Sequence, residues 1–124
     1  MRIPAPLEHD EQVAFIQMVR LHSRRFPELE LLYAVPNGGH RHPATAKRLQ
    51  DEGVAPGVPD MCLPVPRGAY SSLYIEMKRI GNKPTPDQIE MHGKLTRYGN
   101  RVEVCYGAGE AWGVLMDYIK GRLK

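Results

Sequence analysis

The chain has 124 residues, of which 42% are hydrophobic and 25% charged, with a formal charge of +3. This composition excludes an intrinsically disordered chain, and the length is enough for one domain with its own core. No apolar run approaches the roughly 20 residues needed to cross a bilayer, and residues 1–4 lack a signal peptide's apolar stretch. We therefore expect a single domain over residues 1–124 in the cytoplasm, without a membrane partner. The positive charge fits nucleic-acid binding without establishing it.

The first half of the chain predicts two helices and one strand. Residues 8–25 have apolar positions on more than one stripe, so we expect a helix that is buried over most of its circumference. Residues 29–35 form an apolar strand candidate that ends at the turn-forming sequence Pro-Asn-Gly-Gly of residues 36–39. Pro43 is suited to the first turn of a helix over residues 44–52.

The second half predicts a hairpin, a crossover helix, a strand and a final helix. Thr85-Pro86-Asp87-Gln88 matches a capping box and begins a helix that runs to about Tyr98. Apolar patterns predict strands over residues 61–65, 73–78 and 101–106, and a helix over residues 110–123. The last two strands should pair in parallel across the helix between them. The order favours an α/β fold, with a mixed β-sheet flanked by helices.

Two carboxylates and an ammonium group lie beside the predicted hairpin. Glu76 and Lys78 share one strand face, whereas the side chain of Met77 points to the other and predicts core. Asp60 begins the neighbouring strand and comes within several Å of them if the hairpin pairs in register. We expect Mg²⁺ to be held by Asp60, Glu76 and the Met77 carbonyl, with Lys78 orienting the attacking water or stabilising the transition state. The alternative is a cross-strand salt bridge.

The first helix carries two further candidate acids. Glu11 lies on the same helical face as Phe15 and Met18, and an inward acid favours a metal or a water-mediated contact. Glu8 is its rival three residues earlier, and an acid in a first turn also complements the helix dipole. Either carboxylate is therefore a candidate for the site.

The glycine-rich turn carries groups suited to phosphate contact. Asn37, His40 and Arg41 are candidates to bind nucleic acid through backbone N–H groups and the guanidinium, and Arg79 adjoins the carboxylates. The alternative is an ordinary turn with an exposed arginine. His40 and His42 do not predict zinc, because no cysteine or third histidine lies at a zinc-like spacing.

Taken together, these motifs resemble the VRR-NUC domains of the PD-(D/E)xK nuclease superfamily, which have a restriction-endonuclease-like fold. The resemblance covers nearly the whole chain and runs through Glu11-Gln12, Pro36-Asn37-Gly38-Gly39-x-Arg41, Gly53 to Asp60, Glu76-Met77-Lys78, Gln88 and Gly99. It implies a Mg²⁺- or Mn²⁺-dependent phosphodiesterase acting on DNA, with Asp60, Glu76 and Lys78 as its catalytic centre. Glu11 would be the additional first-helix acid. Gln88 would orient the nucleophilic water, although a capping box already accounts for a glutamine at this position.

The resemblance also implies a substrate and an assembly. Stand-alone members of about this length resemble homodimers that cut four-way (Holliday) junctions, in bacterial or phage-infected cytoplasm. A dimer suits symmetric cutting of two strands. Two alternatives stay open: a non-catalytic nucleic-acid-binding module of the same fold, and a nicking or restriction-like nuclease on linear DNA. The fold alone does not separate them.

Overall fold

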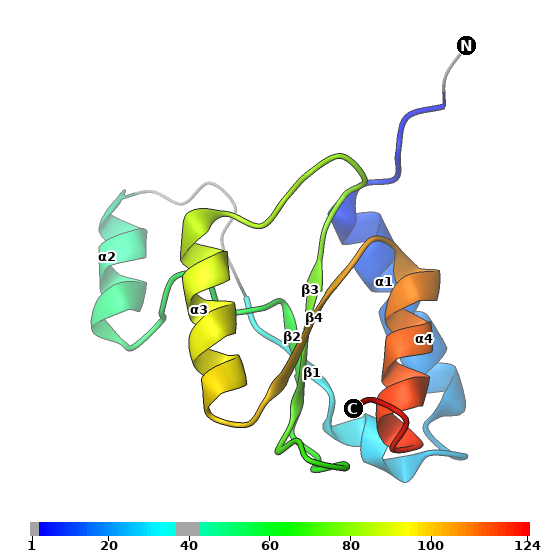
Figure 1. The fold of residues 1–124 in the computed structure, drawn as a ribbon. Helices are drawn as coiled ribbons and strands as arrows, with labels where there is room; N and C mark the ends of the chain where they lie inside the picture. The colour runs from blue at the N-terminus through cyan, green and yellow to red at the C-terminus, as the bar shows by residue number, and fades with distance from the viewer. Residues whose placement is uncertain (1–2, 37–42) are drawn as a thin grey trace.

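The computed structural model describes residues 3–36 and 43–124, which build a mixed sheet with helices on both faces (Figure 1). The sheet has four strands in the order β1-β2-β3-β4. These strands are β1 Tyr33–Ala34, β2 Met61–Leu63, β3 Leu73–Met77 and β4 Arg101–Cys105. Strand β2 pairs antiparallel with both β1 and β3, and β3 pairs with β4 in parallel. The predicted mixed α/β sheet and its parallel strand pair are confirmed.

Two layers of helices enclose the sheet. Figure 1 shows α1 and α4 on one face and α3 on the other, and α2 lies further out beyond α3. The helices are α1 Glu8–His22, α2 Pro43–Asp51, α3 Pro86–Arg97 and α4 Ala108–Ile119. Within the described ranges, every helix is too short or too polar to cross a bilayer.

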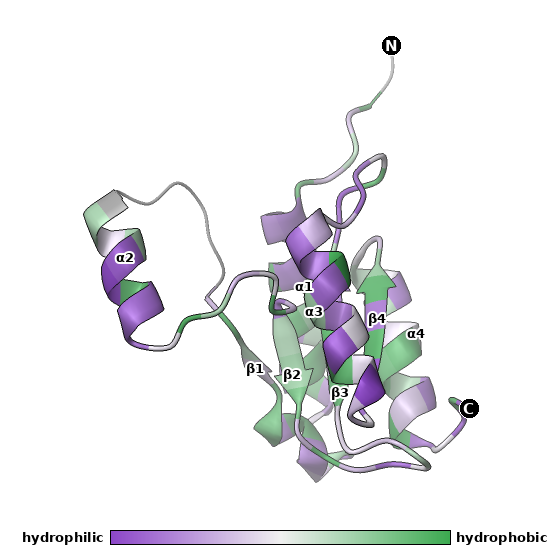
Figure 2. Ribbon diagram, turned by 60° about the vertical axis from the view of Figure 1, so that its left-hand side comes forward, coloured by the Kyte–Doolittle hydropathy of each residue, from purple (hydrophilic) through white to green (hydrophobic). Residues whose placement is uncertain are grey.

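The main core lies between the sheet and the α1/α4 layer. Leu73, Ile75 and Met77 alternate along β3 and are buried against Phe15 of α1 and Leu115 of α4. The central strands are accordingly hydrophobic, whereas α2 is largely hydrophilic (Figure 2). Met77 is therefore a core residue, as predicted.

The face beneath α3 is less well covered. None of the twelve residues of α3, all in the described part of the chain, is fully buried. The predicted capping box is present: Thr85 Oγ1 accepts a hydrogen bond from Gln88 N at 3.3 Å, and Gln88 Oε1 accepts one from Thr85 N at 2.8 Å. Local hydrogen bonds thus fix the start of α3 over a face that includes Tyr74 and Glu76.

The first helix is less buried than its sequence predicts. The α1 helix ends at His22, and its buried residues are Phe15 and Val19, one turn apart on a single stripe. Val13 is 44% exposed and Leu21 80% exposed. The prediction of burial over most of the circumference is wrong, because the sheet and α4 cover one side of α1 and leave the rest at the surface.

The predicted strand over residues 29–35 is largely replaced by a 3₁₀ helix, η1 Pro27–Leu31, which precedes the two-residue strand β1. Pro27 favours a helical first turn, and Leu29 packs into the core from that turn. The strand predicted over residues 61–65 ends at Leu63, because the next residue is a proline and cannot donate to the ladder.

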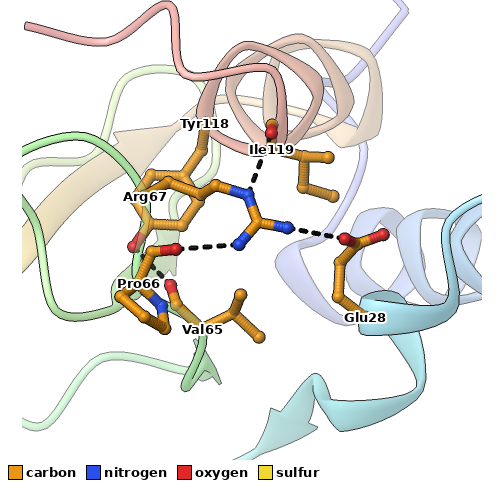
Figure 3. A network of polar contacts seen from close by, with 6 residues as sticks. All are labelled: Glu28, Val65, Pro66, Arg67, Tyr118 and Ile119. Carbon is orange, nitrogen blue, oxygen red and sulfur yellow. Dashed lines mark hydrogen bonds and ion pairs between the residues drawn. The ribbon is translucent and has the colours of Figure 1, made fainter.

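A polar network ties the turn of the β2–β3 hairpin to the α1/α4 layer (Figure 3). Arg67 Nη2 donates to Glu28 Oε2 of η1 at 2.6 Å, and Arg67 Nε donates to the Ile119 carbonyl of α4 at 3.1 Å. Tyr118 Oη donates to the Val65 carbonyl at 2.6 Å in a buried position. These contacts anchor the turn end of the hairpin.

Candidate active site

Asp60 and Glu76 lie at the open end of the β2–β3 hairpin. The register pairs Met61 with Ile75. Asp60, which precedes Met61, therefore lies opposite Glu76, which follows Ile75. Asp60 Oδ2 accepts a hydrogen bond from the backbone N–H of Met77 at 2.7 Å. This bond fixes the aspartate side chain against the end of β3.

Glu76 is a buried acid with an altered pKa. It is 2% exposed, on the sheet face that α3 covers. Burial, a hydrogen bond with the Asp60 carboxyl and the negative charge of Asp60 raise the pKa of Glu76 to about 9. The charge of Glu8 raises this pKa further, and Lys78 opposes the change. The raised pKa favours the protonated form of Glu76 at neutral pH, because that form avoids a second negative charge beside Asp60.

Lys78 continues β3 beyond its last strand residue. Its backbone N–H donates to the Cys105 carbonyl at 2.9 Å, which extends the pairing with β4. The charge of Lys78 lowers the pKa of both Glu76 and His92, so its ammonium group acts on the carboxylate side of the sheet. The structure thus brings Asp60, Glu76 and Lys78 together at one end of the hairpin.

His92 of α3 is a site residue that the sequence analysis missed. Its Nε2 lies 3.5 Å from Glu76 Oε1, and its side chain is 13% exposed. In the described part of the chain, these two atoms are buried without a hydrogen-bond partner. One feature of the sequence could have indicated His92. It lies on the same helical stripe as Gln88 and Leu95, and a helix that links two parallel neighbouring strands must pack one stripe against the sheet.

The two acids of α1 have different partners. Glu11 Oε2 accepts a hydrogen bond from Ala108 N at 2.9 Å, in the first turn of α4. Because the N-cap of α4 is a glycine without a capping side chain, the carboxylate satisfies one free N–H and complements the helix dipole. Glu8 Oε1 accepts from Arg79 N at 3.2 Å, and its charge raises the pKa of Glu76. The structure therefore places the charge of Glu8 near the carboxylate pair and Glu11 at the start of α4, and the site role of Glu11 stays a prediction.

The predicted role of Gln88 competes with its structural role. Its Oε1 is the acceptor of the Thr85 N–H in the capping box. Gln88 would have to leave this cap to orient a nucleophilic water through the same oxygen. Its catalytic role stays a prediction.

The predicted nucleic-acid contacts are described only in part. Arg79 Nε donates to the Ala5 carbonyl at 3.0 Å, so this guanidinium holds the segment before α1 against the site. Its contact with DNA stays a prediction. The other three residues lie outside the described ranges: Asn37, His40 and Arg41.

A glycine joins the loop before Asp60 to the start of α3. Gly57 has φ = +78°, and a Cβ at this position would lie 2.3 Å from the Asp87 carbonyl oxygen. Glycine permits both the positive φ and this backbone contact. The loop that carries Asp60 and the helix that carries His92 therefore meet backbone to backbone.

The donor set at the hairpin end suits a hard divalent cation. Asp60 and Glu76 offer carboxylate oxygens, and the Met77 carbonyl belongs to the residue that follows Glu76 and whose N–H binds Asp60. Among the residues that the structure describes, no group of three or more His, Cys, Asp or Glu side chains is placed to hold a metal ion. Mg²⁺ is bound by one or two carboxylates and keeps several waters, so two acids fit it. A cation would also relieve the cost of two adjacent negative charges.

Comparisons with known proteins agree with this geometry. The VRR-NUC domain model matches residues 8–109. A solved structure named "VRR_NUC domain protein" has a TM-score of 0.74 and 30% sequence identity, covering 94% of this chain and 91% of that one. "Putative nuclease p44" of Acyrthosiphon pisum secondary endosymbiont phage 1 is 40% identical over 48 residues, 39% of this chain and half of that relative's length. The chain belongs to the VRR-NUC family of nuclease domains.

Proposed function

We propose that the protein is a Mg²⁺- or Mn²⁺-dependent DNA endonuclease that hydrolyses phosphodiester bonds at the Asp60–Glu76 pair. The observation that carries this proposal is a buried glutamate whose pKa is raised by burial and by a neighbouring aspartate, with a lysine two residues away. Paired acids with shifted pKa values are typical of catalytic centres. Membership of a nuclease family supports phosphodiester cleavage as the chemistry.

Each residue of the site has a distinct role in this proposal. Asp60, Glu76 and the Met77 carbonyl would hold the cation, and Glu11 or its rival Glu8 would be the first-helix acid. When bound, Mg²⁺ supplies Lewis-acid activation of water and offsets charge on the scissile phosphate. The Met77 N–H keeps the Asp60 carboxylate oriented. The Lys78 ammonium orients the attacking water and stabilises negative charge in the transition state.

The proposal includes branched DNA as the substrate and a homodimer as the active form. Each chain contributes one Asp60–Glu76 pair, and two symmetric cuts need two such sites facing opposite strands. The resemblance to stand-alone members of the family supports four-way junctions as the preferred substrate. The basic residues that adjoin the acids in sequence, Lys78, Arg79 and Lys83, suit a phosphate backbone, which binds largely through charge.

The test is a cleavage assay on labelled four-way junctions, flaps and linear duplexes, with Mg²⁺, Mn²⁺ or EDTA. We expect metal-dependent cleavage that is strongest on the junction, and its loss in Asp60→Asn, which keeps an oxygen to accept from Met77 N. Asp51→Asn is the matched control, because this exposed acid pairs with Lys47 on α2, a helix that stands apart from the sheet (Figure 1).

Two results would contradict the proposal. If wild type leaves every substrate intact with every metal, the protein is not the proposed enzyme. Salt-sensitive DNA binding that neither Mg²⁺ nor Asp60→Asn changes would instead favour the non-catalytic binding module. Equal cleavage of linear and branched DNA would keep the chemistry and replace the proposed substrate.

A further inference from the structure

We propose that His92 is a positioning residue, whose imidazole holds one carboxylate oxygen of Glu76 and directs the other towards Asp60 and a shared cation. The inference rests on the proposed function and deepens it, because it adds a residue from α3 to a site otherwise built by the hairpin. Nothing in the Asp60, Glu76 and Lys78 motif requires a histidine at this position.

The first observation is an unpaired buried pair of polar atoms. Glu76 Oε1 and His92 Nε2 are 3.5 Å apart, and within the described ranges both are buried and lack a hydrogen-bond partner. Buried polar groups without partners destabilise a fold, so their persistence needs an explanation. Hydrogen bonds at catalytic sites are often long in the ligand-free protein and tighten when the complex forms. A small movement of either side chain would make this bond.

The second observation is the rigidity of the helix that carries the imidazole. The capping box fixes the start of α3, and Thr96 Oγ1 donates to the His92 carbonyl at 2.8 Å within the same helix. Gly57 meets the Asp87 carbonyl, which fixes the Asp60 loop against the same helix. These contacts fix the backbone at the start of α3 relative to the loop that carries Asp60.

The third observation concerns what the imidazole can and cannot do here. Among the described residues it does not complete a group of three side chains able to hold a metal ion. It therefore contacts Glu76 rather than replacing a ligand. The Nε2 atom donates in one tautomer and accepts in the other, which suits a partner for a carboxyl group. Such partners orient a ligating carboxylate, and their loss typically weakens metal affinity or activity about 10- to 100-fold.

The experiment compares His92→Leu, His92→Gln and a packing control, Met91→Ala, another half-buried residue of α3. Each variant is measured for Mn²⁺ affinity by isothermal titration calorimetry, for kcat and KM on the junction, and for Tm without metal. We expect His92→Leu to lose about 10- to 100-fold in Mn²⁺ affinity and kcat, with little change in KM. His92→Gln should recover most of this loss, because its amide reaches nearly as far as Nε2. Met91→Ala should lower Tm alone.

If His92→Leu does not fold, His92→Asn is the second test of the expected loss in Mn²⁺ affinity and kcat. Its amide is polar but too short to reach Glu76, so we expect the same losses as in His92→Leu. Wild-type Mn²⁺ affinity and kcat in either His92→Leu or His92→Asn would overturn the positioning role and leave the proposed function intact. If the losses in Mn²⁺ affinity and kcat follow the fall in Tm equally in His92→Gln, His92→Leu and Met91→Ala, His92 serves packing and the positioning role is also overturned.

The Mn²⁺ isotherm separates this inference from the proposed function. If wild type cleaves no DNA, the proposed function fails. Tighter Mn²⁺ binding by wild type and His92→Gln than by His92→Leu would then still support positioning. A wild type that binds no Mn²⁺ would overturn both.

Discussion

The two ends of the β2–β3 hairpin differ in whether their polar groups have hydrogen-bond partners. At the turn end, Arg67 donates to Glu28 and to the Ile119 carbonyl, and the Tyr118 hydroxyl donates to the Val65 carbonyl. At the open end, a buried carboxyl oxygen and a buried imidazole nitrogen lack hydrogen bonds within the described chain. Folding normally pairs buried polar groups, and exceptions concentrate at functional sites. The contrast supports the proposal that the open end is the catalytic site, whereas the contacts at the turn end stabilise the fold.

The largest effect should come from removing the acid at the open end. Glu76→Gln keeps the shape of the side chain but removes its charge, so we expect cleavage to fall by about a thousandfold or more. Stability in the absence of metal should rise at pH 8, because a buried acid no longer needs its proton. Cleavage assays and urea denaturation measure the two effects. Glu90→Gln, an exposed acid of α3 paired with Lys94, is the control. A variant that loses stability and keeps its activity would reverse the assignment of the open end.

The pH dependence of stability sharpens the same contrast. The pKa of Glu76 is raised from 4.5 to about 9 in the folded protein, so the folded state holds a proton that the unfolded state releases above pH 4.5. The contribution of Glu76 to stability is therefore full below pH 4.5 and is lost as pH rises towards 9. Relative to Glu76→Gln, metal-free wild type should lose on the order of a few kcal/mol across this window. Urea denaturation at steps of pH measures this difference, and a flat difference would show that Glu76 is ionised when folded.

A smaller effect is expected at the turn end. Tyr118→Phe removes the hydroxyl that donates to the buried Val65 carbonyl, so the free energy of unfolding should fall by about 1–2 kcal/mol. Because this bond lies away from the acids, kcat and Mn²⁺ affinity of the folded variant should match those of wild type. Chemical denaturation and the cleavage assay check the two halves of this prediction. A drop in kcat without a drop in stability would mean that the turn end also serves chemistry.

The smallest effect is expected outside the hairpin, on α2. Lys47→Met breaks the exposed ion pair with Asp51, whose side chains are 76% and 65% exposed. Such pairs contribute little, so the free energy of unfolding should change by less than about 0.5 kcal/mol. Thermal denaturation at low salt measures it. A change comparable to that of Tyr118→Phe would show that α2 packs more firmly than its exposure indicates.

Local regularities made much of the fold predictable. Alternation along β3 places Glu76 and Met77 on opposite faces, and the Thr85 capping box needs only four consecutive residues. These features depend on neighbours in sequence. The parallel pair β3–β4 follows from the helix between its strands. The burial of α1 was predicted wrongly, because apolar positions alone do not show how many sides of a helix the rest of the chain covers.

The site was predictable only as far as the hairpin determines it. Asp60, Glu76 and Lys78 come together because strand pairing aligns them, and their sequence already shows that alignment. Which acid of α1 reaches them depends on the rotation of that helix against α4, where Glu11 bonds to the first turn. His92 lies sixteen positions after Glu76 and reaches it through the crossing of α3 over the sheet. The helical stripe that His92 shares with Gln88 and Leu95 shows which side of α3 it lies on, but no local pattern gives its distance from Glu76.

The contact at Gly57 links the position of the loop that carries Asp60 to the position of the helix that carries His92. A methyl group on this residue would clash with the Asp87 carbonyl and force the loop away from the helix. The spacing within the site is thus set from a residue that carries no functional group at all. Changes in reactivity could consequently arise by substitution at a position that a search for acids, bases and cations would pass over.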